Sequence, residues 1–191
     1  AAAVSVASPA FAQKQGGTLR ISHRDNPPSA SIHEESTISV NQPFMAVFNN
    51  LVFFDPNEKV NSPDKIVPDL AERWSWNPEL TKLTFKLRQG VKWHDGKPFS
   101  AKDVKCTWDM LAGTSENKLR KNPRTSWWNN VDKVVPDGDL AVTFHLKQPQ
   151  PSILVLMASG YSPVYSCHVA AAEMPTRPIG TGPFKSVESQ Q

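Results

Sequence analysis

A zinc-protease motif is the first chemistry that the residue types suggest. The run HEEST at 33–37 begins like HExxH, in which two histidines one helical turn apart bind zinc and the glutamate acts as a base. Position 37 is Thr, so the second ligand is missing. The other histidines are scattered along the chain without the spacing of metal ligands. We therefore expect no metal site.

A covalent nucleophile and a nucleotide site are not indicated either. Cys167 and His168 are adjacent, which points their side chains apart, so they do not form a nucleophile–base pair. Gly180-Thr181-Gly182 begins like GxGxxG, but Lys185 stands where the third glycine belongs. The sequence has no GxSxG motif and no P-loop. These observations favour a binding protein without enzymatic activity or a cofactor.

Three groups of residues could line a recognition site, which needs apolar walls and a few fixed polar groups. They are a polar loop stiffened by two prolines, an aromatic residue after Gly160, and a glycine turn that we expect to expose its backbone amides. The candidate ligand-binding residues are Asp25, Asn26, Ser29, His33, Glu34, Tyr161, Gly180, Thr181 and Gly182. The alternative for each group is a surface loop, part of the core or a plain turn.

The clearest structural pattern lies between these groups. Thr81–Arg88 alternates apolar and polar residues, which predicts a strand with one buried face. Asp95-Gly96 predicts a turn. Ser100 with Asp103 forms a capping box at a helix start, and Gly113 can end that helix. We expect this whole segment to be scaffold.

Other elements follow from shorter patterns. Alternation and apolar runs predict strands over 18–22, 51–54, 91–93, 131–135, 140–146 and 184–187. Apolar spacing predicts helices over 43–50, 152–157 and 169–174, and a loop with a short helix over 114–130. Cys106 and Cys167 are the only cysteines, and we expect two free thiols, although an oxidising compartment permits a disulfide.

Three motifs in order give the chain a resemblance. It has Pro68-Asp69-Leu70-Ala71 with Trp74, a long run from Leu83 to Val104, and Gly180–Phe184. These resemble the signature elements of the family 5 extracellular solute-binding proteins, which serve dipeptide, oligopeptide and nickel ABC importers. The resemblance covers Gly16 to the last residue and implies a class II, two-lobed periplasmic binding protein-like α/β fold that closes on its ligand by a hinge.

The resemblance also implies a division of the chain. Residues 1–12 are small and apolar and end in Ala10-Phe11-Ala12, a cleavage site, so we interpret them as the remnant of a signal peptide. Residues 13–40 would begin the first lobe, 41–165 would form an inserted mixed α/β subdomain, and 166–191 would return to that lobe before the second one. We expect this chain to hold most of the first lobe only.

The predicted function is capture of a small solute, a peptide by preference, and its delivery to the permease of an ABC transporter in the inner membrane. We expect a periplasmic location in a Gram-negative bacterium and a monomeric full-length protein. The net charge of +3 with interspersed acids and bases does not indicate nucleic-acid binding. Two alternatives stay open, an exported hydrolase and a stand-alone single-lobe interaction module. The sequence does not choose among peptides, nickel complexes, sugars and opines.

Overall fold

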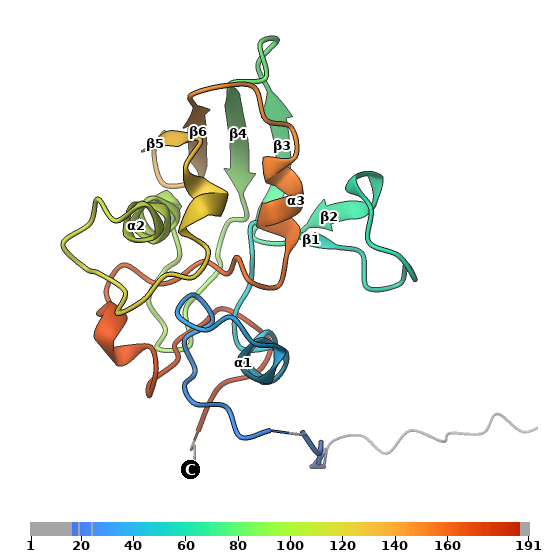
Figure 1. The fold of residues 1–191 in the computed structure, drawn as a ribbon, viewed down its shortest axis with the longest axis vertical. Coiled ribbons are helices and arrows are strands. Elements are labelled where there is room, and N and C mark those ends of the chain that lie inside the picture. The colour runs from blue at the N-terminus through green and yellow to red at the C-terminus, as the bar shows by residue number, and fades with distance from the viewer. Residues whose placement is uncertain (1–16, 19, 24, 188–191) are drawn as a thin grey trace, which may run out of the picture.

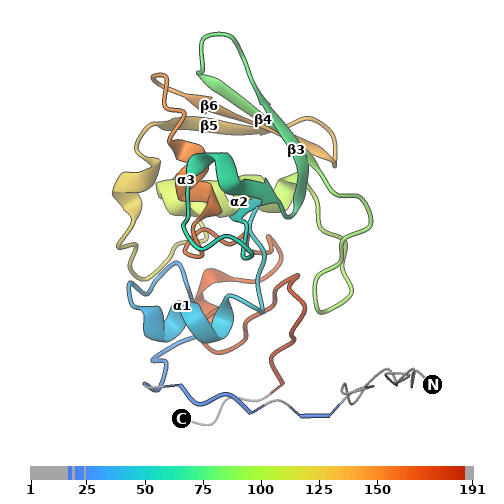
Figure 2. The ribbon, with the colours of Figure 1, turned by 90° about the vertical axis from the view of Figure 1, so that its right-hand side faces the viewer.

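A four-stranded antiparallel sheet dominates the computed structural model, which describes residues 17–18, 20–23 and 25–187 (Figure 1). The strand order is β3-β4-β6-β5. The strands are β3 (Ala71–Trp76), β4 (Lys82–Leu87), β5 (Val131–Pro136) and β6 (Ala141–Leu146). The labelled helices all lie on one side of this sheet, below it in Figure 2.

Alternation along β4 decides which face of the sheet is buried. Leu83, Phe85 and Leu87 have no exposed surface, whereas Lys82 and Lys86 are exposed. Phe85 meets Phe144 of β6 edge to face, with ring centroids 5.7 Å apart. The predicted strands at 81–88, 131–135 and 140–146 are confirmed, the last two as a hairpin in which Gly138 makes the turn with φ +66°.

Helix α2 (Ala101–Ala112) packs against the buried face of the sheet, where the ring of Trp108 lies 4.9 Å from that of Phe144. The predicted capping box is confirmed, since the Ser100 N–H donates to a carboxylate oxygen of Asp103 at 2.9 Å. Gly113 ends the helix in the left-handed conformation, with φ +75°. Local signals therefore fix both ends of this helix.

The remaining elements are short. Strands β1 (Val52–Phe54) and β2 (Ile66–Pro68) form an antiparallel pair, and helix α3 (Ile153–Ala158) contacts β1. These confirm the predicted strand at 51–54 and the predicted helix at 152–157. Single 3₁₀ turns cover Pro63–Lys65, Thr125–Trp128 and Ala171–Glu173. The last one replaces the predicted helix at 169–174.

Three predicted strands are wrong. Within 18–22 the described residues form no strand and Ile21 is 79% exposed, because no strand among the described residues lies beside it to satisfy its backbone groups. Residues 91–93 contribute only an isolated bridge between Lys92 and Pro98. Residues 184–187 form no strand, and Phe184 is 62% exposed. An alternating pattern needs a partner strand to become a strand.

The helix predicted at 43–50 begins five residues earlier and ends six residues earlier, as α1 (Ile38–Phe44). Val47 and Phe48 are buried, whereas Phe44 is partly buried and Met45 is exposed. The Val47 N–H still donates to the Phe44 carbonyl, but other groups of 46–50 have partners from distant segments. The Val47 carbonyl accepts the Gly182 N–H at 2.9 Å, and the Asn50 N–H donates to Asp69 at 2.8 Å. These contacts end the helix.

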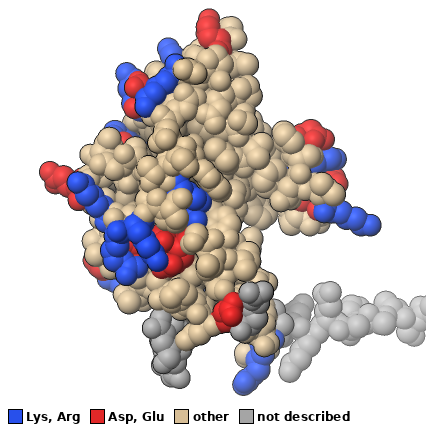
Figure 3. Space-filling view, in the orientation of Figure 1, with Lys and Arg blue, Asp and Glu red and all other residues tan. Residues whose placement is uncertain are grey.

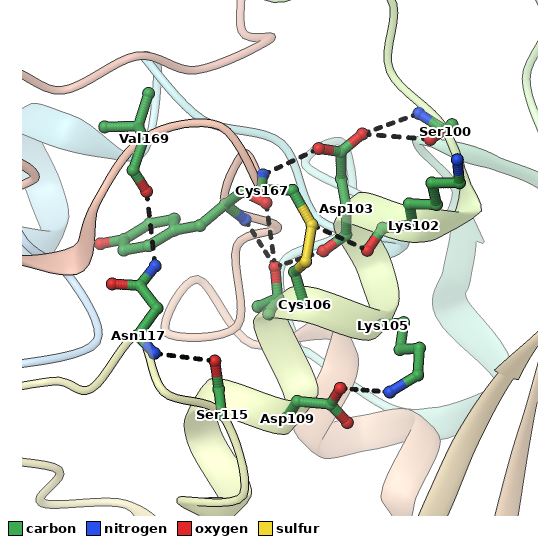
Figure 4. The surroundings of a disulfide bond; sticks show 12 residues. Ser100, Lys102, Asp103, Lys105, Cys106, Asp109, Ser115, Asn117, Cys167 and Val169 are labelled. Carbon is green, nitrogen blue, oxygen red and sulfur yellow. Dashed lines mark hydrogen bonds and ion pairs between the residues drawn. A yellow bond between two sulfur atoms is a disulfide. The ribbon is translucent and has the colours of Figure 1, made fainter.

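The expectation of two free thiols is wrong, because Cys106 and Cys167 form a disulfide with a Cα–Cα distance of 5.6 Å (Figure 4). Helix α2 places Cys106 beside the segment that contains Tyr165 and Cys167. The Cys167 N–H donates to Asp103 at 2.9 Å, and the Tyr165 N–H donates to the Thr107 hydroxyl at 2.9 Å. These two bonds align the segments, so the sulfur atoms meet within bonding distance.

No helix in the described part of the chain has the length and apolar character needed to span a bilayer.

Candidate functional site

The motifs at 68–71 and 180–184 meet at one backbone segment, 46–50, and the run 83–104 contacts both of these motifs. A hollow of about 320 Å³ lies against this segment. Its walls are mainly apolar, and its polar groups come from two asparagines and one aspartate. The lining residues are Ile32, Met45, Ala46, Phe48, Asn49, Asn50, Phe53, Pro68, Asp69, Gly160, Pro163 and Pro183. Apolar walls with a few fixed polar groups are the usual composition of a small-molecule site.

The turn at Gly180–Gly182 is held by His94, which belongs to the Trp93–Gly96 part of the signature run. The His94 N–H donates to the Gly180 carbonyl at 2.9 Å, and the Gly180 N–H lies 3.3 Å from His94 Nδ1. His94 Nε2 lies 2.8 Å from the Gly182 carbonyl oxygen. Both ring nitrogens and the main chain of His94 therefore engage the turn.

The same turn packs directly on the backbone of Ala46 and Val47, and this contact requires glycine. A Cβ atom at Gly180 would lie 1.8 Å from the Val47 carbonyl oxygen, and one at Gly182 would lie 2.5 Å from the Ala46 oxygen. Gly182 N–H donates to Val47 at 2.9 Å. The expectation that this turn exposes its amides is wrong for both glycines, because both amides have partners within the chain.

A hydrogen-bond chain links the turn to the first motif across the rim of the hollow. The Thr181 hydroxyl donates to Asn49 Oδ1 at 3.0 Å, and Asn49 Nδ2 donates to Asp69 at 2.8 Å. The Asn50 N–H donates to the other carboxylate oxygen at 2.8 Å. Burial raises the pKa of the Asp69 carboxyl, and the hydrogen bonds from Asn50 and Asn49 oppose that shift only in part. The rim thus offers an oriented carboxylate and an oriented amide.

A comparison with family models supplies the deciding observation. The model of the bacterial extracellular solute-binding proteins, family 5, matches residues 65–191. This chain belongs to that family. The matched residues contain the strands of the sheet, helix α2 and the Gly180–Gly182 turn.

Relatives and solved structures of family 5 agree with the match. A putative ABC transporter peptide-binding protein of Brucella ovis is 31% identical over 148 residues, which cover 72% of this chain and 26% of the relative. The dipeptide-binding protein of Escherichia coli is 28% identical over 166 residues, covering 76% of this chain and 30% of that protein. The chain thus spans less than a third of the length of these relatives.

The fold is also that of known family 5 proteins. The dipeptide-binding protein of Pseudoalteromonas in complex with Met-Leu matches with a TM-score of 0.77, over 87% of this chain and 36% of that one, at 24% identity. The mixed α/β structure described above is therefore part of a periplasmic binding protein fold. The predicted boundaries at 13–40, 41–165 and 166–191 stay a prediction, and residues 1–12 lie outside the described residues.

None of the nine candidate residues lines the hollow, although their neighbours Ile32, Gly160 and Pro183 do. Asp25 and Asn26 are exposed, and Asp25 accepts a hydrogen bond from the Ser39 hydroxyl at 2.7 Å. Ser29 is buried and donates to Glu35 at 3.3 Å. The polar loop therefore runs from solvent at Asp25 into the interior at Ser29.

His33 and Glu34 are buried, and partners within the chain occupy them. His33 Nε2 lies 2.7 Å from the Pro163 carbonyl oxygen, and burial lowers the pKa of His33 to about 3. Arg120 donates to both oxygens of Glu34, the shorter side-chain bond being 2.8 Å. Burial would raise the pKa of Glu34, but Arg120 outweighs that effect and lowers it. Both residues hold the loop in place.

Tyr161 is partly buried and lies beside the buried residue Arg124. Arg124 stands 4.7 Å above the Tyr161 ring and donates to the Glu35 carbonyl at 2.8 Å. Figure 3 shows basic groups next to acidic ones over this face, in keeping with ion pairs such as Glu34–Arg120 and Glu35–Lys121. The ring of Tyr161 therefore has a cation–π partner within the chain.

Two residues of the rim, Asn49 and Asp69, were missing from the sequence prediction. Asp69 stood in a recognised motif but was not among the candidate ligand-binding residues. Asn49 belongs to a pair of amides placed directly before the apolar run 51–54, and that polar-to-apolar junction was the available signal. Their proximity depends on a contact across 20 residues, which local patterns do not contain.

Proposed function

We propose that this chain is part of the periplasmic solute-binding component of an ABC importer, and that it captures a peptide for a membrane permease. The observation that carries the proposal is the hollow beside segment 46–50, which residues of two family motifs help to line. It combines apolar walls with the oriented Asn49 amide and the Asp69 carboxylate. The ligand class is supported by the names of the curated relatives, which are peptide- and dipeptide-binding proteins.

The rim suits a peptide for a chemical reason. A peptide carries an ammonium group and backbone N–H groups, and both bind to carboxylate or carbonyl oxygens. Asp69 already accepts one hydrogen bond on each oxygen, and a carboxylate has room for further donors. The apolar wall formed by Phe48 and Phe53 would contact a side chain of the ligand. We propose Asn49 and Asp69 as contacts on this side of the ligand.

The earlier candidates divide by their surroundings. Thr181 acts on the rim through Asn49, and Asp25, Asn26 and Tyr161 stay proposed contacts for a ligand that extends beyond the hollow. Ser29, His33, Glu34, Gly180 and Gly182 would act by holding the wall in shape, since their polar groups have partners within the chain. Binding involves no covalent chemistry, and the full-length protein works as a monomer beside its permease.

Export to the periplasm fits two features of the chain. Residues 1–12 have the small, apolar composition and the A-x-A end of a signal peptide. The Cys106–Cys167 disulfide suits an oxidising compartment.

Calorimetric titration of the full-length protein with di- and tripeptides tests the proposal. We expect saturable one-to-one binding without hydrolysis of the peptide. Asn49→Ala should weaken binding by about tenfold, because it removes a rim donor and loosens Asp69. Asn57→Ala, in an exposed turn, is the matched control and should bind like the wild type. Absence of peptide binding, or release of cleaved peptide, would contradict the proposal; binding of an opine or a nickel complex instead would correct the ligand.

A further inference from the structure

One histidine of the second family motif joins that motif to the third by hydrogen bonds. His94 makes three contacts with the Gly180–Gly182 turn, two from its ring and one from its main chain. The His94 residue lies 86 positions before Gly180, so the contact joins the turn after β4 to the last described segment. The ring is partly buried, and it is the side chain that bridges the two glycines.

The partners of the ring determine where its proton lies. Gly180 N–H is a donor, so Nδ1 must accept, and the Gly182 carbonyl is an acceptor, so Nε2 must carry the hydrogen. This assignment is the neutral Nε2–H tautomer. A protonated ring would direct an Nδ1–H at the Gly180 N–H, two donors facing each other. The two contacts of the His94 ring with Gly180 and Gly182, which together form a clasp on the turn, therefore require a neutral ring.

The other side of the turn is fixed by backbone alone. Gly182 and Phe184 donate to Val47 and Ala46 at 2.9 and 3.2 Å. The turn is therefore held between the His94 ring on one side and the segment that borders the hollow on the other. Any shift of the turn also shifts Thr181, and with it the Asn49–Asp69 rim.

We propose that His94 is a positioning residue for ligand binding: its neutral ring clasps Gly180 and Gly182 and so fixes the rim of the hollow. The expected effect on ligand affinity rests on the proposed function, whereas the contacts between His94 and the turn do not depend on it. His94 does not line the hollow and acts through Thr181 and Asn49. The hydrogen-bond roles of its two nitrogens make distinct predictions for substitutions that keep only one of them.

Three variants of the full-length protein separate the two contacts. Gln keeps a donor near the position of Nε2, Asn keeps an acceptor near that of Nδ1, and Phe keeps the ring without either. The Nε2 contact is the shorter one, 2.8 against 3.3 Å. We expect Kd for a bound dipeptide to rise in the order wild type, His94→Gln, His94→Asn, His94→Phe, with about two- to tenfold for each lost hydrogen bond. His145→Gln, on the open face of the sheet, is the control and should leave Kd unchanged.

Two readouts distinguish positioning from general stability. Affinities are measured well below the melting temperature of every variant. If His94→Gln and His94→Asn melt at the same temperature but His94→Gln binds the dipeptide more tightly, the difference in Kd reflects positioning and not general stability. Nitrogen NMR of histidine-labelled protein without ligand should show Nδ1 of His94 unprotonated and Nε2 protonated. An Nδ1–H tautomer, or equal Kd for the wild type and His94→Phe, would overturn the proposal. If the wild type binds no solute, the proposed function fails, and the tautomer still tests the clasp.

Discussion

Loss of the Cys106–Cys167 disulfide should destabilise the protein strongly. The two cysteines are 61 positions apart, so the bond closes a long loop in the unfolded chain. In the chain-entropy account, a loop of that length corresponds to about 4 kcal/mol of stabilisation. Measured values commonly fall below such estimates, so we expect about 2–4 kcal/mol.

The surroundings of the disulfide explain why its removal should act on the unfolded state. Cys167 N–H remains bonded to Asp103, and Thr107 remains bonded to Tyr165. Figure 4 shows the bond from Cys167 to Asp103 beside the sulfur atoms, so the native contact between α2 and Tyr165–Cys167 should persist without the covalent link. The double variant Cys106→Ser/Cys167→Ser should therefore fold and keep its native spectrum.

Urea unfolding of the full-length protein provides the assay. The double variant should have a lower midpoint than the oxidised wild type, and reduction of the wild type should reproduce that decrease. A reducing agent should leave the double variant unchanged, which controls for other effects of the reagent. Peptide mapping should find Cys106 joined to Cys167. Two alkylatable thiols in the oxidised protein, or an unchanged midpoint in the double variant, would refute the reasoning.

Three further predictions concern single residues. Because burial lowers the pKa of His33 to about 3, the unfolded chain takes up a proton below about pH 6.5 that the native chain does not. The free energy of unfolding should therefore fall by about 1.4 kcal/mol per pH unit as the pH drops from about 6.5 toward 3. Urea titrations at stepped pH should show that His33→Gln removes this part of the pH dependence. Gly180→Ala should cost about 1–3 kcal/mol or prevent folding, because its Cβ would meet the Val47 carbonyl; a wild-type melting temperature would contradict this. Asp103→Ala should lower stability by about 1–2 kcal/mol through loss of its bonds to the Ser100 and Cys167 N–H groups, and Ser100→Ala by less, as thermal melts can compare.

Elements specified by neighbouring residues could be predicted from the sequence. The period of β4, the capping box of α2 and the glycine that ends it are local features, and the structure confirms each of them. The prediction of a strand at 18–22 was wrong because a local pattern does not show whether a partner strand lies beside it. The helix near residue 43 was displaced because distant groups take the backbone of 46–50.

The candidate site was harder to predict for the same reason. His33 and Glu34 were predicted as ligand contacts because they lie in a polar loop stiffened by prolines, yet their partners Pro163 and Arg120 lie 130 and 86 positions away. The disulfide likewise depends on how α2 lies against a segment 61 positions later. The motifs identified the family, whereas the meeting of two of them at segment 46–50 required the three-dimensional structure.

Hydrogen–deuterium exchange of the full-length protein with and without a dipeptide tests the central claim most directly. That claim places the hollow beside Ala46–Asn50 in the wall of the ligand site. We expect the peptide to slow exchange in the segments 45–50 and 180–184, while the distant β5–β6 hairpin keeps its rates. Slowed exchange elsewhere, with no change in these two segments at a saturating ligand concentration, would contradict the account.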